Sequence, residues 1–233
     1  MRTSNKPLFW RETTMKFLRK LLKHLLILLL IVSLLTLAGS YAMSYLGTAN
    51  YPVRYGREIE EVAKEENLDP RLVAAIIKTE SDFRADVIAK DGGLGLMQLM
   101  PETAKEMCKE VGIDYSEEAV LDPVTNIRLG CHHLASLIQK YQNRHLAAAA
   151  YNVGHTKVDQ WLEEGTITWE LESMKKIPVP ITQKYVQKVD KAFSIYSVFY
   201  PDQLPEDTGK MNRFGLAWTN LCRTANWAHQ KVK

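Results

Sequence analysis

One carboxylate in this chain of 233 residues stands in an unusual place. Glu80 closes a run that is typical of a helix, and the positions three, four and seven residues earlier on the same helix face hold Ile77, Ile76 and Val73. Partial burial there would raise the pKa of the carboxyl group, as a proton donor that works near neutral pH requires. The same spacing fits a plain structural role, in which Glu80 turns to water or pairs with Lys78 or Arg84.

A glycine-rich segment follows this helix. Gly92-Gly93-Leu94-Gly95 places three glycines in four positions, which allows close backbone contact or a positive φ angle. Met97 and Gln98 come next and offer an apolar wall and an amide that can hydrogen-bond a sugar. By itself, the segment is equally consistent with a tight connection between helices.

A third segment sets an aromatic ring beside an amide. Tyr151 and Asn152 come just before Gly154, a residue typical of the end of a helix. The pair could contact a ligand, although an ordinary helix C-terminus has the same pattern.

The cysteines do not indicate a metal or redox site. Cys108, Cys131 and Cys222 show no Cys-x-x-Cys spacing, so we expect buried free thiols, with a disulfide between two of them as the alternative. Cys131-His132-His133 cannot itself form a nucleophile and base, because adjacent residues on a helix point in different directions. The chain also lacks the HExxH, GxSxG, GxGxxG and phosphate-loop motifs. We therefore expect no metal and no cofactor.

The elements that position these groups are predicted to be helices, because no stretch shows sustained alternation of apolar and polar residues. Asp69 followed by Pro70 starts the helix that ends near Glu80, and Asp122 followed by Pro123 starts one that runs to about Tyr141. Further helices are expected over 54–67, 101–111, 145–151, 156–163 and 182–200. The predicted fold class is all-α.

The N-terminal region predicts one membrane-spanning helix. Residues 1–24 carry seven basic side chains and one acidic one, and residues 25–46 form an apolar run without a charge. Such a run is long enough to cross a bilayer, and the basic flank is expected to stay in the cytoplasm. A cleaved signal peptide is the alternative, with Ser40-Tyr41-Ala42 as its cleavage site. Residues 47–54 are expected to be a linker.

The formal net charge of +3 does not indicate a nucleic-acid partner. Residues 25–200 contain 18 Lys and Arg against 23 Asp and Glu, so the part beyond the apolar run is acidic. Nucleic-acid binding requires clustered cations, and we expect none. The tail, 201–233, has no assignable role and is expected to be a disordered or weakly docked extension.

Three segments taken in order resemble a known family. Glu80-Ser81, Gly95–Pro101 and Ala150–Gly154 resemble the catalytic domain of the soluble-lytic-transglycosylase-like family of peptidoglycan lytic transglycosylases. The resemblance covers about residues 55–200 and includes the segments 121–127 and 177–186. It implies a mostly helical, goose-type-lysozyme-like domain with a cleft that binds glycan strands.

The resemblance also implies a mechanism and its residues. Glu80 would be the single acid and base at the bond between N-acetylmuramic acid and N-acetylglucosamine, giving a 1,6-anhydro product. Met97 and Gln98 would line the cleft, and Tyr151 and Asn152 would position the sugar and its acetamido group. Tyr185 would lie beside the catalytic acid.

The chain departs from the family pattern at two places. Ala89 stands where the family usually has serine, and Ile181-Thr182-Gln183 replaces the usual Glu-Thr-Arg. The expected protein is a transglycosylase tethered to the cell membrane, with its domain facing the cell wall. The alternatives are a weakly active or inactive wall-binding scaffold of an envelope-spanning complex, and a hydrolytic muramidase of the same fold.

Overall fold

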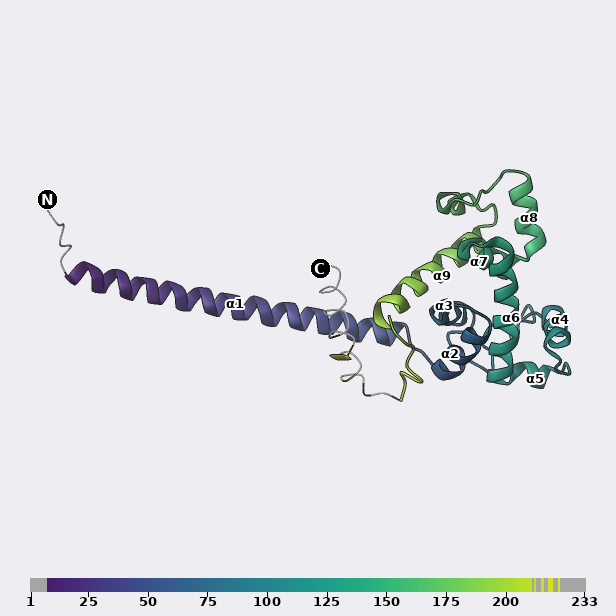
Figure 1. Cartoon of the computed structure of the whole chain (residues 1–233), viewed down its shortest axis with the longest axis horizontal. Helices are drawn as coiled ribbons and strands as arrows, with labels where there is room; N and C mark the ends of the chain where they lie inside the picture. The colour runs from purple at the N-terminus through teal and green to yellow at the C-terminus, as the bar shows by residue number, and fades with distance from the viewer. Residues whose placement is uncertain (1–7, 211, 213–214, 216–217, 220–221, 223–233) are drawn as a thin grey trace.

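The computed structural model describes residues 8–210 together with 212, 215, 218, 219 and 222. A long helix, α1 (Leu8–Asn50), extends away from a body of shorter helices (Figure 1). The body contains α2 (Gly56–Glu65), α3 (Pro70–Glu80), α4 (Pro101–Val111), α5 (Glu117–Leu121), α6 (Pro123–Tyr141), α7 (Arg144–Val153), α8 (His155–Glu163), the 3-10 helix η1 (Leu171–Lys176) and α9 (Pro180–Phe199). The described residues contain only isolated β-bridges between Ile88, Leu94 and Leu99, which confirms the all-α prediction.

The predicted helix starts are confirmed in detail. The side chain of Asp69 accepts a hydrogen bond from the amide of Arg71, and Asp122 does the same for Thr125. Proline occupies the first turn in both helices, where its missing N–H costs nothing. The short helices α5 and η1 were not predicted, because five or six residues are too few for a clear apolar period.

Helix α3 lies at the centre of the main core. Its residues 72–77 are all buried, and it packs against α2 and α9. Helices α6 and α7 complete this core, and a smaller cluster of apolar side chains joins α4 and α5 to α6. The C-terminal end of α3 is thereby fixed by helices that come from distant parts of the chain.

Two cysteine predictions are confirmed and one is wrong. Cys108 and Cys131 are buried free thiols. Cys222 is a free thiol too, but it is exposed, because it lies on the tail beyond the packed body.

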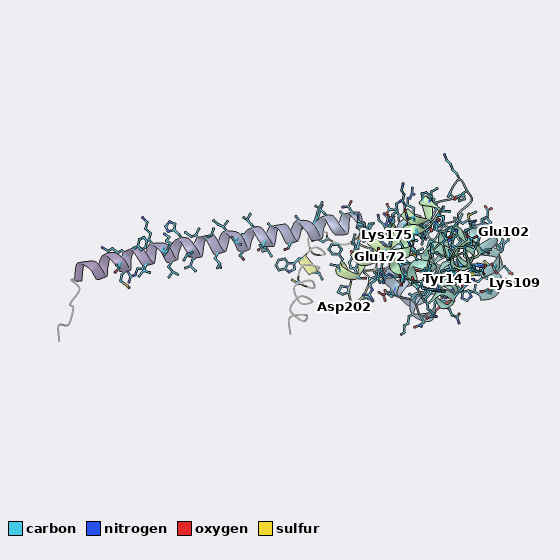
Figure 2. The ribbon with its side chains drawn as sticks, turned by 90° about the horizontal axis from the view of Figure 1, so that it is seen from above. Glu102, Lys109, Tyr141, Glu172, Lys175 and Asp202 are labelled. Atoms are coloured by element: carbon cyan, nitrogen blue, oxygen red, sulfur yellow. The ribbon has the colours of Figure 1, made fainter. Side chains whose placement is uncertain are left out.

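Helix α1 contains the expected apolar segment. Residues Thr14–Gly47 are long and apolar enough to cross a membrane, and none of the most apolar part is buried inside the protein. The described side chains along the apolar segment of α1 stand away from the helix (Figure 2), and the large apolar ones are exposed, whereas the core side chains of the body are buried. Of the basic flank, residues 1–7 lie outside the described residues.

The junction between α1 and the body differs from the expected linker. The helix continues to Asn50, and Gly47 packs so closely on Phe199 of α9 that an added Cβ would lie 2.2 Å from the Phe199 ring. The ring of Tyr51 then packs edge-on against Tyr196. Residues 47–50 therefore belong to helix α1, and the missing side chain of Gly47 lets α9 approach it.

The first part of the tail is docked, contrary to the prediction of a disordered or weakly docked extension. Thr208 pairs with Val53 through both backbone and side chain, and the Gly56 amide donates to the Glu206 carbonyl at 3.0 Å. Leu204 is buried, and its amide donates to the Glu60 carboxylate at 2.7 Å. Residues 201–209 thus belong to the body, while residues 223–233 of the tail lie outside the described residues.

Candidate active site

Glu80 is the last residue of α3, and its partner comes from α9. The hydroxyl of Tyr185 donates a hydrogen bond of 2.6 Å to Oε1 of Glu80. The basic neighbours do not pair with Glu80: Lys78 binds Asp82, and Arg84 donates to the Ser81 carbonyl. Of the two sequence interpretations, the geometry fits a carboxyl group held on the apolar side of its helix.

The surroundings of Glu80 change its acidity. Burial raises the pKa of its carboxyl group, the hydrogen bond from Tyr185 lowers it, and the negative charge of Asp91 raises it further, giving a pKa of about 7. Such a group holds a proton at neutral pH for a substantial part of the time and can take it back after losing it. This is the property that a residue acting as both acid and base requires.

Ser81 connects the C-terminal end of α3 to the glycine-rich loop. Ser81 is almost completely buried, and its hydroxyl donates to the Leu96 carbonyl at 2.7 Å. The loop is thereby fixed next to Glu80. Gly95 takes a φ of 70°, a conformation that favours glycine, and an added Cβ would lie 2.5 Å from the Asn126 amide nitrogen.

Asn126 on α6 holds the other side of this loop. Its Oδ1 accepts from the Met97 amide at 2.7 Å, and its Nδ2 donates to the carbonyls of Leu94 and Val120. The residue is 0% exposed, so all of its hydrogen bonds are made inside the protein. The hydrogen bonds of buried Asn126 therefore hold the glycine-rich loop in its conformation.

Met97 and Gln98 shape the loop from within. The side chain of Met97 is fully buried against Gly130 of α6, where an added Cβ would lie 2.3 Å from the sulfur. This differs from the expected place on a cleft wall, because the absence of a side chain at Gly130 opens a notch that the sulfur fills. The Gln98 amide nitrogen donates to the carbonyls of Val87 and Gly95, and Gln98 itself has a φ of 47°. Its donor groups thus support the loop.

Tyr151 and Asn152 lie at the C-terminal end of α7 and face different partners. The Tyr151 hydroxyl donates to the Met97 carbonyl at 2.9 Å, and its ring lies 5.2 Å from the ring of His133. Asn152 is exposed, and its Oδ1 accepts from the hydroxyl of Thr182 on α9 at 2.9 Å. Tyr151 therefore joins the loop to α7, and Asn152 joins α7 to α9.

Four of the predicted site residues have side chains that hydrogen-bond to a residue of another element: Glu80, Tyr151, Asn152 and Tyr185. Sequence reasoning assigned no role to Ser81, Asn126 and Thr182. Asn126 lies beside Ile127 in the first turn of an apolar helix pattern, which places it near the core but does not predict its partners. Among the described residues, no cluster of His, Cys, Asp and Glu side chains is arranged to hold a metal ion.

Comparison with known proteins identifies the domain. Residues 57–168 match the family model described as transglycosylase SLT domain. This part of the chain is a transglycosylase SLT domain. The SLT domain includes Glu80, the glycine-rich loop, Asn126, Tyr151 and Asn152, whereas Thr182 and Tyr185 of α9 follow the matched range.

Relatives of the SLT domain are lytic transglycosylases by name. The soluble lytic murein transglycosylase of Escherichia coli K12 is 31% identical over 159 residues, which are 66% of this chain and 24% of that protein. The membrane-bound lytic murein transglycosylase F of Stutzerimonas stutzeri is 37% identical over 130 residues, 53% of this chain and 25% of that protein. The chain thus spans about a quarter of the length of these relatives.

A solved structure has the same fold. The lytic transglycosylase Slt of Pseudomonas aeruginosa, solved as an inactive mutant with a glutamate replaced by glutamine, matches with a TM-score of 0.61 and 34% identity. The match covers 67% of this chain and 26% of that one. The lysozyme-like helical fold expected from the sequence is therefore confirmed.

Proposed function

We propose that this chain is a membrane-anchored lytic transglycosylase that cleaves peptidoglycan glycan strands, with Glu80 as its acid and base. The observation that carries the proposal is the contact of Glu80 with Tyr185, together with a pKa of about 7 for the carboxyl group. The SLT domain and the names of its relatives support the same activity. The inactive glutamate-to-glutamine mutant of the Pseudomonas aeruginosa relative agrees with a glutamate in this role.

In the proposed reaction, protonated Glu80 gives its proton to the oxygen that links N-acetylmuramic acid to N-acetylglucosamine. The bond from C1 of the muramic acid to this oxygen breaks, and positive charge develops at C1, where the substrate's own N-acetyl oxygen stabilises it. Ionised Glu80 then takes the proton of the C6 hydroxyl as that oxygen attacks C1. The first proton leaves on the hydroxyl of the released N-acetylglucosamine, the C6 proton restores protonated Glu80, no water is consumed, and a 1,6-anhydro sugar results.

The neighbours of Glu80 have distinct proposed roles. Tyr185 holds the carboxyl group in place and supports its charge while the proton is away. Asn152 is exposed and can hydrogen-bond the acetamido group of the sugar. Tyr151, Met97 and Gln98 act by fixing the loop beside Glu80, because their polar groups or side chains are already engaged inside the protein.

A hydrolytic muramidase is the second candidate, and Asp91 is the observation that favours it. The negative charge of Asp91 raises the pKa of Glu80, as the smallest of the three influences on it, and Asp91 is exposed. A second carboxylate can activate a water molecule in glycoside hydrolysis. Asp91→Asn would then abolish release of products with reducing ends, whereas a transglycosylase with this substitution continues to form anhydro products.

The anchor is proposed from α1. The charge-free run 25–46 lies within the apolar segment of α1, and basic residues at 16, 19, 20 and 23 precede it. These charges favour a cytoplasmic N-terminus, which places the SLT domain outside the cell membrane, next to the cell wall. The name of the membrane-bound relative supports the membrane anchor. Sequencing the N-terminus of the mature protein tests the cleaved-signal alternative, because cleavage after Ala42 would remove the anchor.

The experiment that tests the activity uses the full chain in lipid vesicles with purified peptidoglycan. We expect anhydro-muropeptides in the mass spectrum, and Glu80→Gln should slow their release about 10²- to 10⁴-fold. Glu102→Gln is the matched control, because Glu102 is exposed on α4 (Figure 2) and, among the described residues, forms an ion pair only with Lys105. Release by Glu80→Gln at the parent rate would refute the assignment. No release by the parent would favour the wall-binding scaffold, and reducing ends would favour the muramidase.

A further inference from the structure

Helix α9 contacts both sides of the site through one face of its first two turns. Thr182 and Tyr185 are three residues apart, so their side chains lie on the same face. Tyr185 reaches Glu80 at the end of α3, and Thr182 reaches Asn152 near the end of α7. The proposed acid and the proposed sugar-binding amide are thus both held by hydroxyl groups of this helix.

The hydrogen bond from Thr182 orients the side-chain amide of Asn152. An asparagine side chain has an oxygen that only accepts hydrogen bonds and a nitrogen that only donates them, and the two ends have nearly the same shape. Thr182 donates to the oxygen at 2.9 Å. Within the described residues the nitrogen of Asn152 makes no hydrogen bond, so its two N–H groups are available at an exposed position.

The two partners differ in their freedom. Thr182 is 1% exposed, so its hydroxyl is fixed by the packing between α7 and α9. Asn152 is exposed and its amide can rotate about the terminal side-chain bond. Without the hydroxyl, nothing among its described contacts would favour one orientation of the amide over the other.

We propose that Thr182 is a positioning residue that orients the Asn152 amide, so that this point of the site presents hydrogen-bond donors to the substrate. Such a point selects a carbonyl oxygen, as in an N-acetylated amino sugar. It disfavours the same sugar without its acetyl group, because that sugar carries an ammonium group that can only donate. The inference rests on the proposed function only in taking a glycan as the ligand.

The test compares the full-length parent with Thr182→Val and Thr182→Ser. Valine keeps the shape of threonine without the hydroxyl, and serine keeps the hydroxyl without the methyl group. Binding of an N-acetylglucosamine tetrasaccharide and of its de-N-acetylated form is measured by calorimetry in detergent, with Glu80→Gln present in all proteins to prevent cleavage. We expect the parent to prefer the acetylated form, Thr182→Val to lose about 3- to 10-fold of that preference, and Thr182→Ser to retain it.

Several results would overturn the inference. These are equal preference in Thr182→Val and the parent, a loss in Thr182→Ser as large as in Thr182→Val, or no preference in the parent. In the cleaving enzyme, the loss should appear in KM, with kcat and the pH profile of Glu80 unchanged, and a loss confined to kcat would also contradict it. Because binding is measured without cleavage, the role of Thr182 can stand even if the proposed activity fails.

Discussion

The hydroxyl of Tyr185 donates to Oε1 of Glu80 at 2.6 Å, although 105 positions separate the two residues in the sequence. This hydrogen bond lowers the pKa of the Glu80 carboxyl group, whereas burial raises it. Burial favours the protonated form of Glu80, and the phenol favours the ionised form. The pKa of about 7 is the balance between them, and it makes both forms of Glu80 accessible near neutral pH.

Replacing Tyr185 with phenylalanine should therefore raise the pKa of Glu80 above about 7. The reaction starts from the protonated acid, so the alkaline limb of the pH–rate profile should move upward by about one pH unit. The rate of muropeptide release as a function of pH measures the shift. Tyr115→Phe is the control, since Tyr115 packs on the smaller apolar cluster of α4 and α5, with Lys105 over its ring. An unchanged limb in Tyr185→Phe would contradict a direct effect on the acid.

Glu80 should also make the stability of the fold depend on pH. Its pKa rises from 4.5 to about 7 on folding, so the folded state holds a proton that the unfolded state has lost between these values. Stability from this group is fully present below about pH 4.5 and is lost as the pH rises through about 7.

Glu80→Gln, which cannot ionise, should consequently be more stable than the parent at about pH 8, by about 1–3 kcal/mol, and similar to it at about pH 4.5. Urea denaturation at the two pH values measures the difference. A constant difference at both values would show that Glu80 is not the titrating group.

The sequence predicts the elements better than the contacts between them. Asp69-Pro70 and Asp122-Pro123 define their helix starts because capping depends on neighbours in the chain. The apolar residues on the helix of Glu80 allow its burial, but the same spacing also fits a carboxylate that turns to water, so the sequence left both interpretations open. The partner of Glu80, Tyr185, could be expected only from a family resemblance, because no local rule connects α3 to α9.

The missed residues share a physical cause. Asn126 makes hydrogen bonds to Leu94, Met97 and Val120, and Thr182 binds Asn152, so their roles exist only after distant segments have packed. The docked tail was missed for the same reason. Leu204 is a lone apolar residue among prolines and acids, and its burial depends on a site formed by the segment around Val53 and Glu60.

Leu204→Ala should destabilise the body by about 2–4 kcal/mol, because it leaves a cavity where a buried side chain was. A disordered tail would give almost no change. Thermal unfolding of the full chain distinguishes the two, with Gln203→Ala as the control at an exposed neighbouring position. If both variants unfold at the temperature of the parent, residues 201–209 do not contribute to the core.

His132 of α6 should link α2 to α4 in a pH-dependent way. Its Nδ1 and Nε2 each lie 3.0 Å from a carboxylate oxygen, of Glu66 and Glu110 respectively. Burial lowers the pKa of His132, but the hydrogen bonds and charges of the two carboxylates outweigh this and raise it above its usual 6.5. Both contacts are charge-assisted when the ring is protonated, and a neutral ring can donate to only one of the two carboxylates.

The stability that His132 contributes is thus fully present below about pH 6.5 and is lost as the pH rises through the higher pKa of the folded state. His132→Gln should lower the urea midpoint more at about pH 6 than at about pH 9. Titration of Glu80 affects the parent and the variant equally, so it cancels in the comparison. His155→Gln is the control, because His155 is exposed on α8 and shares its carboxylate, Asp159, with Lys140. A gap between parent and His132→Gln that is the same at both pH values, or larger at the higher one, would mean that the protonated ring does not join these helices.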